Sequence, residues 1–317
     1  MTTPPRYLIG IGAQKCASTW VFDVLSRHPG VAAPARKELD FFSARFDRGY
    51  RWYAGQWPAS APCRVENSPS YLAHPAAAGR VAAFAPDARI ICTLRDPVER
   101  AYSHHLHEVA RGHIPPIPFE AALDANPSYL EQGHYARALR PWVDSFPDSA
   151  RLCLLAEDIR ADPFAAWAAL LDFAGLPHKP LPLAGRGARN VSDRARSATL
   201  RHVLRSGGRA LSALRLDGVR DAARNAPGLS HLLRWNALPL RQVIPPPGAA
   251  LRAHLARGFA ADMEQLCTML GRDSLPWPSW QAVTRAQRYP SDRKRAAASR
   301  PAMRLPSGTG WVPSPDM

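Results

Sequence analysis

The chain has 317 residues, of which 46% are hydrophobic, so it is long enough to bury a sizeable core without help from disulfides. Its sequence contains no uninterrupted apolar run of about 18 residues, which excludes a transmembrane helix. Residues 1–6 lack the basic-then-apolar layout of a signal peptide. The five cysteines lie far apart, which disfavours both a disulfide scaffold and a zinc ribbon. A cytoplasmic location is therefore expected.

The net charge of +15 is concentrated in the second part of the chain. Residues 1–180 hold 19 basic and 18 acidic groups, whereas residues 181–317 hold 22 basic and 8 acidic groups. Such a surplus suits an anionic partner, for example a nucleotide phosphate, an acidic polymer or a membrane surface. Only four of the 41 cations are lysines, so a coding bias toward arginine is an alternative cause.

Three short apolar runs predict buried strands, and each is followed by a helical pattern. The strands are expected at 7–12, 88–94 and 151–156. One helix is expected at 18–26 and another at 164–174. A further helix is expected to begin at Pro97, with Asp96 as its N-cap. Strands that alternate with helices predict a mostly parallel α/β sheet, whose ligands bind at the carboxyl ends of the strands.

The C-terminal part of the chain has a different organisation. A basic stretch from about 194 to 245 with amphipathic pieces predicts a helical insertion, or lid, over the sheet edge. A last helix is expected from about Ala249 to Leu270, ending at Gly271. Residues 281–317 are rich in Pro, Arg and Ser and predict a disordered tail. We therefore expect one domain over 1–280 that contains the insertion.

The loop after the first strand is a candidate anion site. Backbone amides at the start of a helix attract anions, a lysine adds a point charge, and two hydroxyls add donors. The order of residues differs from a Walker loop, because two residues separate the lysine from the first serine. The alternative is that Lys15 is an ordinary solvated lysine. The candidate residues are Gln14, Lys15, Cys16, Ala17, Ser18 and Thr19.

The exit from the second predicted strand supplies a second candidate anion site. Arg95 follows the strand, and Ser103 lies eight residues later, about two helical turns along. An arginine guanidinium suits a phosphate group. Taken alone, the Arg95-Asp96-Pro97 run is explained equally well by a helix cap with an ion pair.

Four segments in order resemble the sulfotransferases that use 3′-phosphoadenosine 5′-phosphosulfate (PAPS), most closely the heparan sulfate sulfotransferases and their bacterial relatives. They are Gly12–Thr19, Lys37–Phe42, Arg95–Ser103 and Ala156–Pro163. The resemblance covers roughly residues 7–180 and, less closely, 249–280. It implies an α/β, P-loop-like three-layer fold with a central, mostly parallel sheet flanked by helices, plus the helical lid insertion.

The resemblance also implies roles for individual residues. Lys15 would neutralise the charge that develops on the leaving oxygen, while the rest of the 14–19 loop binds the phosphosulfate. Arg95 and Ser103 would bind the 3′-phosphate, with Arg194 and Arg196 as further phosphate contacts. Glu38 is the candidate general base, and the alternative is an ion pair with Lys37 or an arginine. PAPS would be the donor, 3′,5′-ADP the product, and no metal is expected.

Three residues depart from the family pattern. Ala17 replaces a usual glycine, which is a small change if its φ is negative. Asp40 stands where the heparan enzymes often carry His, and Asn67 where they often carry Lys. Both positions are expected on the acceptor side, so the uronic-acid chemistry of those enzymes does not transfer to this chain.

Two residue groups have more than one interpretation. His104, His105 and His107 lack the carboxylate or cysteine spacing of a metal site and are expected on a helix surface near the nucleotide. Trp52, Tyr53 and Trp57 suit either an acceptor pocket or the core.

The predicted function is transfer of a sulfuryl group to a hydroxyl or amine of a carbohydrate or glycolipid. No nucleic-acid partner is expected, and the basic insertion is a candidate for peripheral membrane contact. One alternative is a P-loop small-molecule kinase, which requires Mg²⁺ and an acidic residue at the second strand's end, where Arg95 stands. The other is a non-enzymatic polyanion- or membrane-binding protein, whose binding would collapse with salt.

Overall fold

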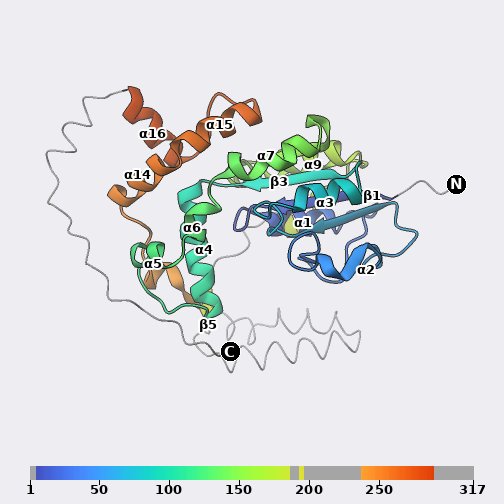
Figure 1. The fold of residues 1–317 in the computed structure, drawn as a ribbon, viewed down its shortest axis with the longest axis horizontal. Coiled ribbons are helices and arrows are strands. Elements are labelled where there is room, and N and C mark those ends of the chain that lie inside the picture. Colours follow the sequence, from blue (N-terminus) through green and yellow to red (C-terminus); the bar gives the residue numbers. More distant parts are fainter. Residues whose placement is uncertain (1–4, 186–192, 196–236, 289–317) are drawn as a thin grey trace.

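The computed structural model describes residues 5–185, 193–195 and 237–288, and its core is a four-stranded parallel sheet (Figure 1). The strands are β1 (Arg6–Gly12), β2 (Cys63–Asn67), β3 (Arg89–Leu94) and β4 (Arg151–Leu155). Their order is β2-β1-β3-β4, and every neighbouring pair is parallel. All four strands therefore end at the same edge of the sheet, where β1 and β3 are direct neighbours.

Helices cover both faces of the sheet, as side-chain alternation along the strands requires. Leu8, Val65 and Ile91 face a layer that contains α1 (Ser18–Leu25) and α9 (Pro163–Ala174). Ile9, Ile11, Ile90 and Cys92 face the opposite layer, which contains α3 (Ala77–Phe84), α4 (Pro97–Arg111) and α7 (Tyr135–Ser145). The three-layer α/β fold predicted from the sequence is confirmed.

The remaining described elements are short or belong to the C-terminal part. Among residues before 186 they are α2 (Gly49–Ala54), α5 (Phe119–Ala125), α6 (Ser128–Glu131), α8 (Ala156–Ala161) and 3₁₀ turns at Phe46–Arg48, Asp148–Ala150 and Leu183–Gly185. Later elements are β5 (Asp193–Ala195), β6 (Ala237–Pro239), α13 (Leu240–Val243), α14 (Ala249–Gly258), α15 (Ala260–Leu270) and α16 (Pro278–Arg288). β5 and β6 form an antiparallel pair that packs against α4.

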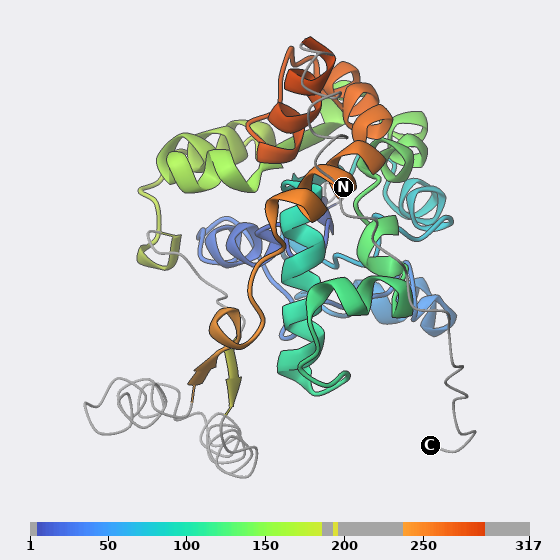
Figure 2. The same ribbon diagram turned by 90° about the vertical axis from the view of Figure 1, so that its left-hand side faces the viewer.

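The C-terminal helices gather beside the end of the sheet where α4 begins (Figures 1 and 2). α14 contacts α4, while α15 contacts α7 and both pack against α16. Buried side chains from this part, including Leu255, Met263 and Trp277, belong to the same apolar core as the sheet residues. The C-terminal helices are therefore integral to the fold around the strand ends.

Two predictions about the C-terminal part are wrong in detail. The helix expected from 249 to 270 is two helices, α14 and α15, that meet at Phe259, although it does end at Gly271 with a left-handed φ of 59°. The tail expected from 281 is helical as far as residue 288, because Pro278 starts α16 and Val283 packs into the core. Residues 289–317 lie outside the described part.

The predicted helical insertion lies almost wholly outside the described residues. Within 194–245 the structure describes only 194–195 and 237–245, which include parts of β5, β6 and α13. Over the ranges that are described, no helix combines the length and the apolar character needed to cross a bilayer.

Candidate active site

The loop between β1 and α1 is tied to the neighbouring strand β3. The amide of Ala13 donates to the carbonyl oxygen of Thr93 at 2.7 Å, and Thr93 Oγ1 donates to the carbonyl oxygen of Gly12 at 3.2 Å. Lys15 and Ala17 have left-handed φ values of 69° and 71°, so the loop turns back sharply before α1 begins. The loop therefore presents its backbone and the start of α1 at the carboxyl edge of the sheet, where an anion can bind.

Ala17 takes a backbone conformation that suits the glycine it replaces. Its φ is 71° and it forms the N-cap of α1. Its carbonyl oxygen accepts from the amides of Trp20 at 2.9 Å and Val21 at 3.4 Å, which starts the helix. The replacement of glycine by alanine would be a small change only if φ were negative. Because φ is positive, Ala17 carries steric strain that glycine would avoid.

We expect Ala17→Gly to raise the free energy of unfolding by about 0.5–1 kcal/mol, because relief of left-handed strain exceeds the added entropy of the unfolded chain. Urea denaturation of the full chain measures the difference. Ala82→Gly, inside α3, is the opposite control, since glycine in a helix interior costs about 1 kcal/mol. A destabilised Ala17→Gly variant would contradict the strain at this position.

Lys15 extends from the loop toward α4, where it meets a histidine that sequence analysis did not assign a role. Its Nζ lies 3.4 Å from Nδ1 of His107. Burial lowers the pKa of Lys15, and the charges of Arg95 and Arg111 lower it further, whereas Glu38 raises it. Lys15 therefore lies within electrostatic range of both Arg95 and Glu38. His107 was expected on a helix surface near the nucleotide, and it follows Ser103 by one helical turn on α4.

His107 is held in its neutral form by the same cluster. Burial lowers its pKa to about 4, and Lys15 and Arg111 contribute, while Glu108 and Glu38 act in the opposite direction. A concentration of positive charge that lowers the pKa of its own members favours an anionic ligand, whose charge would relieve the repulsion.

Arg95 lies directly after β3, and only part of its guanidinium group forms polar contacts within the protein. Its Nη2 lies 3.3 Å from Oε2 of Glu99, and its Nε is buried without a hydrogen-bond partner. The carbonyl oxygen of Arg95 accepts from the hydroxyl of Tyr135 at 2.9 Å, which anchors the backbone. Ser103 lies on α4 one turn after Glu99 and is 8% exposed. The unused Nε suits a ligand with several oxygen acceptors, as a phosphate has.

The start of α4 is capped as the sequence predicts. Asp96 Oδ1 accepts from the amides of Val98 at 2.9 Å and Glu99 at 3.2 Å, and Pro97 is the first helical residue. Arg100, the second arginine of the same segment, is fully buried and donates to Gln132 Oε1 at 3.1 Å and to backbone carbonyls. It therefore supports the fold, and Arg95 is the arginine of this segment that faces the site.

Glu38 forms the ion pair that was its alternative interpretation, and it also lies within electrostatic range of Lys15 and His107. Its Oε1 lies 2.7 Å from Nζ of Lys37, and its side chain is 45% exposed. The same Nζ donates to Oγ1 of Thr19 at 3.3 Å, so Lys37 links Glu38 to the first turn of α1. The charge of Glu38 also acts on Lys15 and His107. An ion pair and a site position are therefore compatible for this carboxylate.

The other predicted residues differ in which of their groups could contact an anion. The thiol of Cys16 is buried 3.6 Å from the Tyr135 hydroxyl, and burial raises its pKa to about 11, so this residue offers its backbone alone. Gln14 is half-buried beside Lys15, and Ser18 is buried at the start of α1. Arg194 lies in β5, whose side chains are not described, and Arg196 lies outside the described residues.

The two expected acceptor-side positions divide between surface and core. Asp40 is half-buried, and its Oδ1 accepts from Oγ of Ser70 at 2.8 Å. Asn67 is 2% exposed, and its Nδ2 donates to the carbonyl oxygen of Ser18 at 3.0 Å. Asn67 is thus held from the end of β2 against the backbone of α1, and its acceptor-side position stays a prediction.

Glu66, next to Asn67, is a buried carboxyl group beneath the same region. It accepts from the hydroxyls of Ser68 and Tyr71, the latter at 3.2 Å. Burial raises its pKa to about 8, and the charge of Asp40 acts in the same direction. Glu66 is consequently protonated at neutral pH and adds no negative charge to the site.

Two residue groups with open interpretations are now located. His104 and His105 are buried, and Nε2 of His105 lies 2.9 Å from the carbonyl oxygen of Ile117, so the expected surface cluster is wrong for these two. Tyr53 and Trp57 pack in the core with their rings 5.0 Å apart. Within the described residues no group of three potential ligand side chains is placed to hold a metal ion.

Part of this chain is similar to known sulfotransferases. Residues 42–180 match the sulfotransferase family. The chain is 30% identical over 184 residues to mouse heparan sulfate glucosamine 3-O-sulfotransferase 3B1, covering 54% of this chain and 46% of the relative. It is 28% identical over 192 residues to a bifunctional heparan sulfate N-deacetylase/N-sulfotransferase of Caenorhabditis elegans, covering 55% of this chain and 22% of the relative. The chain thus spans half or less of these relatives' lengths.

A solved structure shares the fold. The sulfotransferase from Alicyclobacillus acidocaldarius superposes with a TM-score of 0.52 and 24% identity, covering 70% of this chain and 97% of the other. At that level of identity the similarity shows a common fold and carries no conclusion about substrates.

Proposed function

We propose that this chain, whose residues 42–180 match the sulfotransferase family, transfers the sulfuryl group of PAPS to a hydroxyl or amine of a carbohydrate acceptor. One observation carries the proposal: β1 and β3 are parallel neighbours, so the Lys15 loop and Arg95 lie at the same edge of the sheet, where the charge of Arg95 lowers the pKa of Lys15. A nucleotide with phosphate groups at both its 5′ and 3′ positions would satisfy both cations.

The residues present fit such a donor. Lys15 and the start of α1 would bind the 5′-phosphosulfate, while the free Nε of Arg95 and the hydroxyl of Ser103 would bind the 3′-phosphate. Burial lowers the pKa values of Lys15 and His107, and neighbouring positive charges lower them further; a bound anion would offset that second contribution. The donor therefore supplies negative charge that this site lacks.

In the transfer step, a lone pair of the acceptor oxygen forms a bond to sulfur as the bond from sulfur to the 5′-phosphate oxygen breaks. The acceptor proton passes to the carboxylate of Glu38, and 3′,5′-ADP leaves. Lys15 stabilises the charge that grows on the departing oxygen. Like phosphoryl transfer, this reaction depends mainly on positioning and charge stabilisation. Lys37 would hold Glu38 beside Thr19 and so orient the base.

A carbohydrate or glycolipid acceptor is the narrower part of the proposal. The relatives that match are named for sulfation of heparan sulfate, which supports a sugar. Asp40 at the candidate acceptor side favours an acceptor without dense negative charge, because like charges repel. The two alternatives have less support: Arg95 stands where a kinase would carry an acidic residue, and a simple polyanion binder needs no ordered Lys15 loop.

Calorimetry with 3′,5′-ADP and with ATP–Mg²⁺ tests the proposal. We expect the wild-type chain to bind 3′,5′-ADP without metal and more tightly than ATP–Mg²⁺. Arg95→Ala should weaken 3′,5′-ADP binding roughly 10–100-fold, since hydrogen bonds to charged groups contribute about 1.5–3 kcal/mol. Arg89→Ala, at the opposite end of β3, is the matched control and should leave the affinity unchanged.

The other outcomes separate the alternatives. Preference for ATP–Mg²⁺ would identify a kinase instead. Binding of neither nucleotide, together with salt-sensitive binding to heparin or anionic vesicles, would identify a polyanion- or membrane-binding protein.

A further inference from the structure

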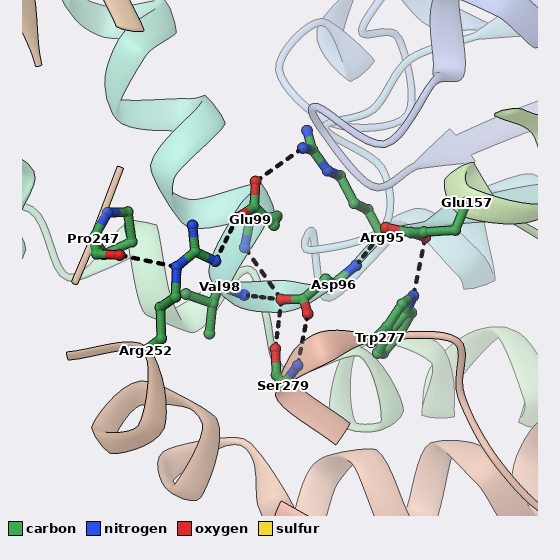
Figure 3. A network of polar contacts seen from close by, with 9 residues as sticks. All are labelled: Arg95, Asp96, Val98, Glu99, Glu157, Pro247, Arg252, Trp277 and Ser279. Carbon is green, nitrogen blue, oxygen red and sulfur yellow. Dashed lines mark hydrogen bonds and ion pairs between the residues drawn. The ribbon is translucent and has the colours of Figure 1, made fainter. Parts of the chain in front are cut away.

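Glu99 lies between two arginines that come from distant parts of the chain. Figure 3 shows its carboxylate between the guanidinium groups of Arg95 and Arg252. Oε1 of Glu99 lies 2.5 Å from Nη1 of Arg252, whereas Oε2 lies 3.3 Å from Nη2 of Arg95. The carboxylate is thus held more closely by the arginine of α14 than by the arginine that follows β3.

Arg252 is fixed on a second side and sits on a well-anchored part of the fold. Its Nε donates to the carbonyl oxygen of Pro247 at 2.9 Å. The start of α16 is bound to the turn between β3 and α4, because the amide of Ser279 donates to Oδ2 of Asp96 at 2.9 Å. Nε1 of Trp277 donates to Oε2 of Glu157 at 3.0 Å, as Figure 3 also shows. The C-terminal part of the chain therefore contacts the β3–α4 turn and its surroundings through several hydrogen bonds.

The position of Glu99 creates an electrostatic problem for the proposed 3′-phosphate site. Glu99 precedes Ser103 by four residues on α4, so the two side chains lie on the same face of the helix. A phosphate that reaches both Ser103 and Arg95 must lie beside the Glu99 carboxylate. Without a counter-charge, Glu99 would repel the phosphate and would also compete with it for Arg95.

Arg252 supplies that counter-charge. Its closer contact with Glu99 neutralises the carboxylate from the side opposite Arg95, and Arg241 adds further positive charge nearby, with its guanidinium carbon 5.2 Å from the centre of the Tyr102 ring. Arg95 is left with a longer ion pair and a free Nε.

We propose that Arg252 is a positioning residue of the 3′-phosphate site, which neutralises Glu99 and thereby leaves Arg95 free to bind the phosphate. This inference rests on the proposed use of PAPS. It extends the nucleotide site from the first 180 residues to α14, beyond the segment that matches the sulfotransferase family.

The test compares 3′,5′-ADP with 5′-ADP by calorimetry. The dissociation constant of 5′-ADP divided by that of 3′,5′-ADP measures the contribution of the 3′-phosphate to binding. Arg252→Met should lower this ratio about tenfold while the affinity for 5′-ADP stays unchanged. Arg252→Lys keeps the charge and should keep most of the ratio. Glu99→Gln combined with Arg252→Met removes both charges of the pair and should restore the ratio to within about threefold of wild type.

Arg272→Met is the matched control, because Arg272 also joins the C-terminal helices to the core, through Asp158 at 2.9 Å. It should leave the ratio unchanged. An unchanged ratio in Arg252→Met, an equal loss for both nucleotides, or no recovery in the double variant would each overturn the role of Arg252. A wild-type chain that does not distinguish 3′,5′-ADP from 5′-ADP would instead overturn the proposed function itself.

Discussion

Lys15→Ala is expected to lower the rate of sulfuryl transfer about 100–1,000-fold, the effect of removing one preorganised charge from a developing oxyanion. The ammonium group is partly buried and lies among other cations, so it is already positioned before the donor arrives. Its removal should also weaken 3′,5′-ADP binding, because it would contact the 5′-phosphate in the ground state. The rate is measured as transfer of labelled sulfate from PAPS to a panel of glucosamine-containing oligosaccharides.

Lys179→Ala is the matched control for this variant. Lys179 is exposed in the segment after α9, where its carbonyl oxygen accepts from the indole of Trp167 at 2.7 Å, and the substitution leaves that backbone contact in place. It removes the same charge and should keep full activity. If Lys15→Ala retained wild-type transfer, the loop would have no catalytic role, whatever its effect on binding.

Glu38→Gln is expected to lower transfer by about 100-fold or more, which is the usual contribution of a general base. The amide has the shape of the carboxylate and its oxygen still accepts a hydrogen bond from Lys37, so the local structure should persist. Because the substitution removes only the ability to accept a proton, 3′,5′-ADP affinity should stay within about twofold of wild type. This separation of rate from nucleotide affinity distinguishes Glu38 from Lys15 and Arg95.

Asp40→Asn tests the competing base in the same segment. Asp40 lies two residues from Glu38, and its carboxylate accepts from Ser70. We expect this variant to keep most of the transfer rate and to change the acceptor preference. Full activity in Glu38→Gln, combined with loss in Asp40→Asn, would move the general base to Asp40.

The strands and loops that carry the donor site were predictable because their signals are local. β1, β3 and β4 are short apolar runs, and Asp96 with Pro97 marks the start of α4 by capping chemistry alone. The β2 strand was not predicted. It contains the buried charged residues Arg64 and Glu66, and Nη1 of Arg64 donates to the hydroxyl of Tyr7, 57 residues earlier, at 2.8 Å. Charged residues in a short strand conceal its burial when their partners are far away in sequence.

The distinction between local signals and contacts with distant residues also applies to the candidate site. Lys15, Arg95 and Ser103 were selectable by residue type and spacing, and Glu38 through the family resemblance. The left-handed φ of Ala17 and the inward thiol of Cys16 depend on the folded loop. His107 meets Lys15 only because the fold brings α4 to the β1–α1 loop. The buried position of Asn67 likewise follows from its contact with α1.

The order of residues along the chain by itself determined the parallel α/β architecture and the two cationic loops, since hydrophobic periodicity and helix capping act over a few neighbouring residues. Only the tertiary structure decided that both loops lie at one edge of the sheet and that Arg252 pairs with Glu99, 153 residues away in sequence. Contacts between distant segments depend on how the helices and the sheet pack together. No local pattern encodes that packing, because each side chain meets its partner only after the core has formed.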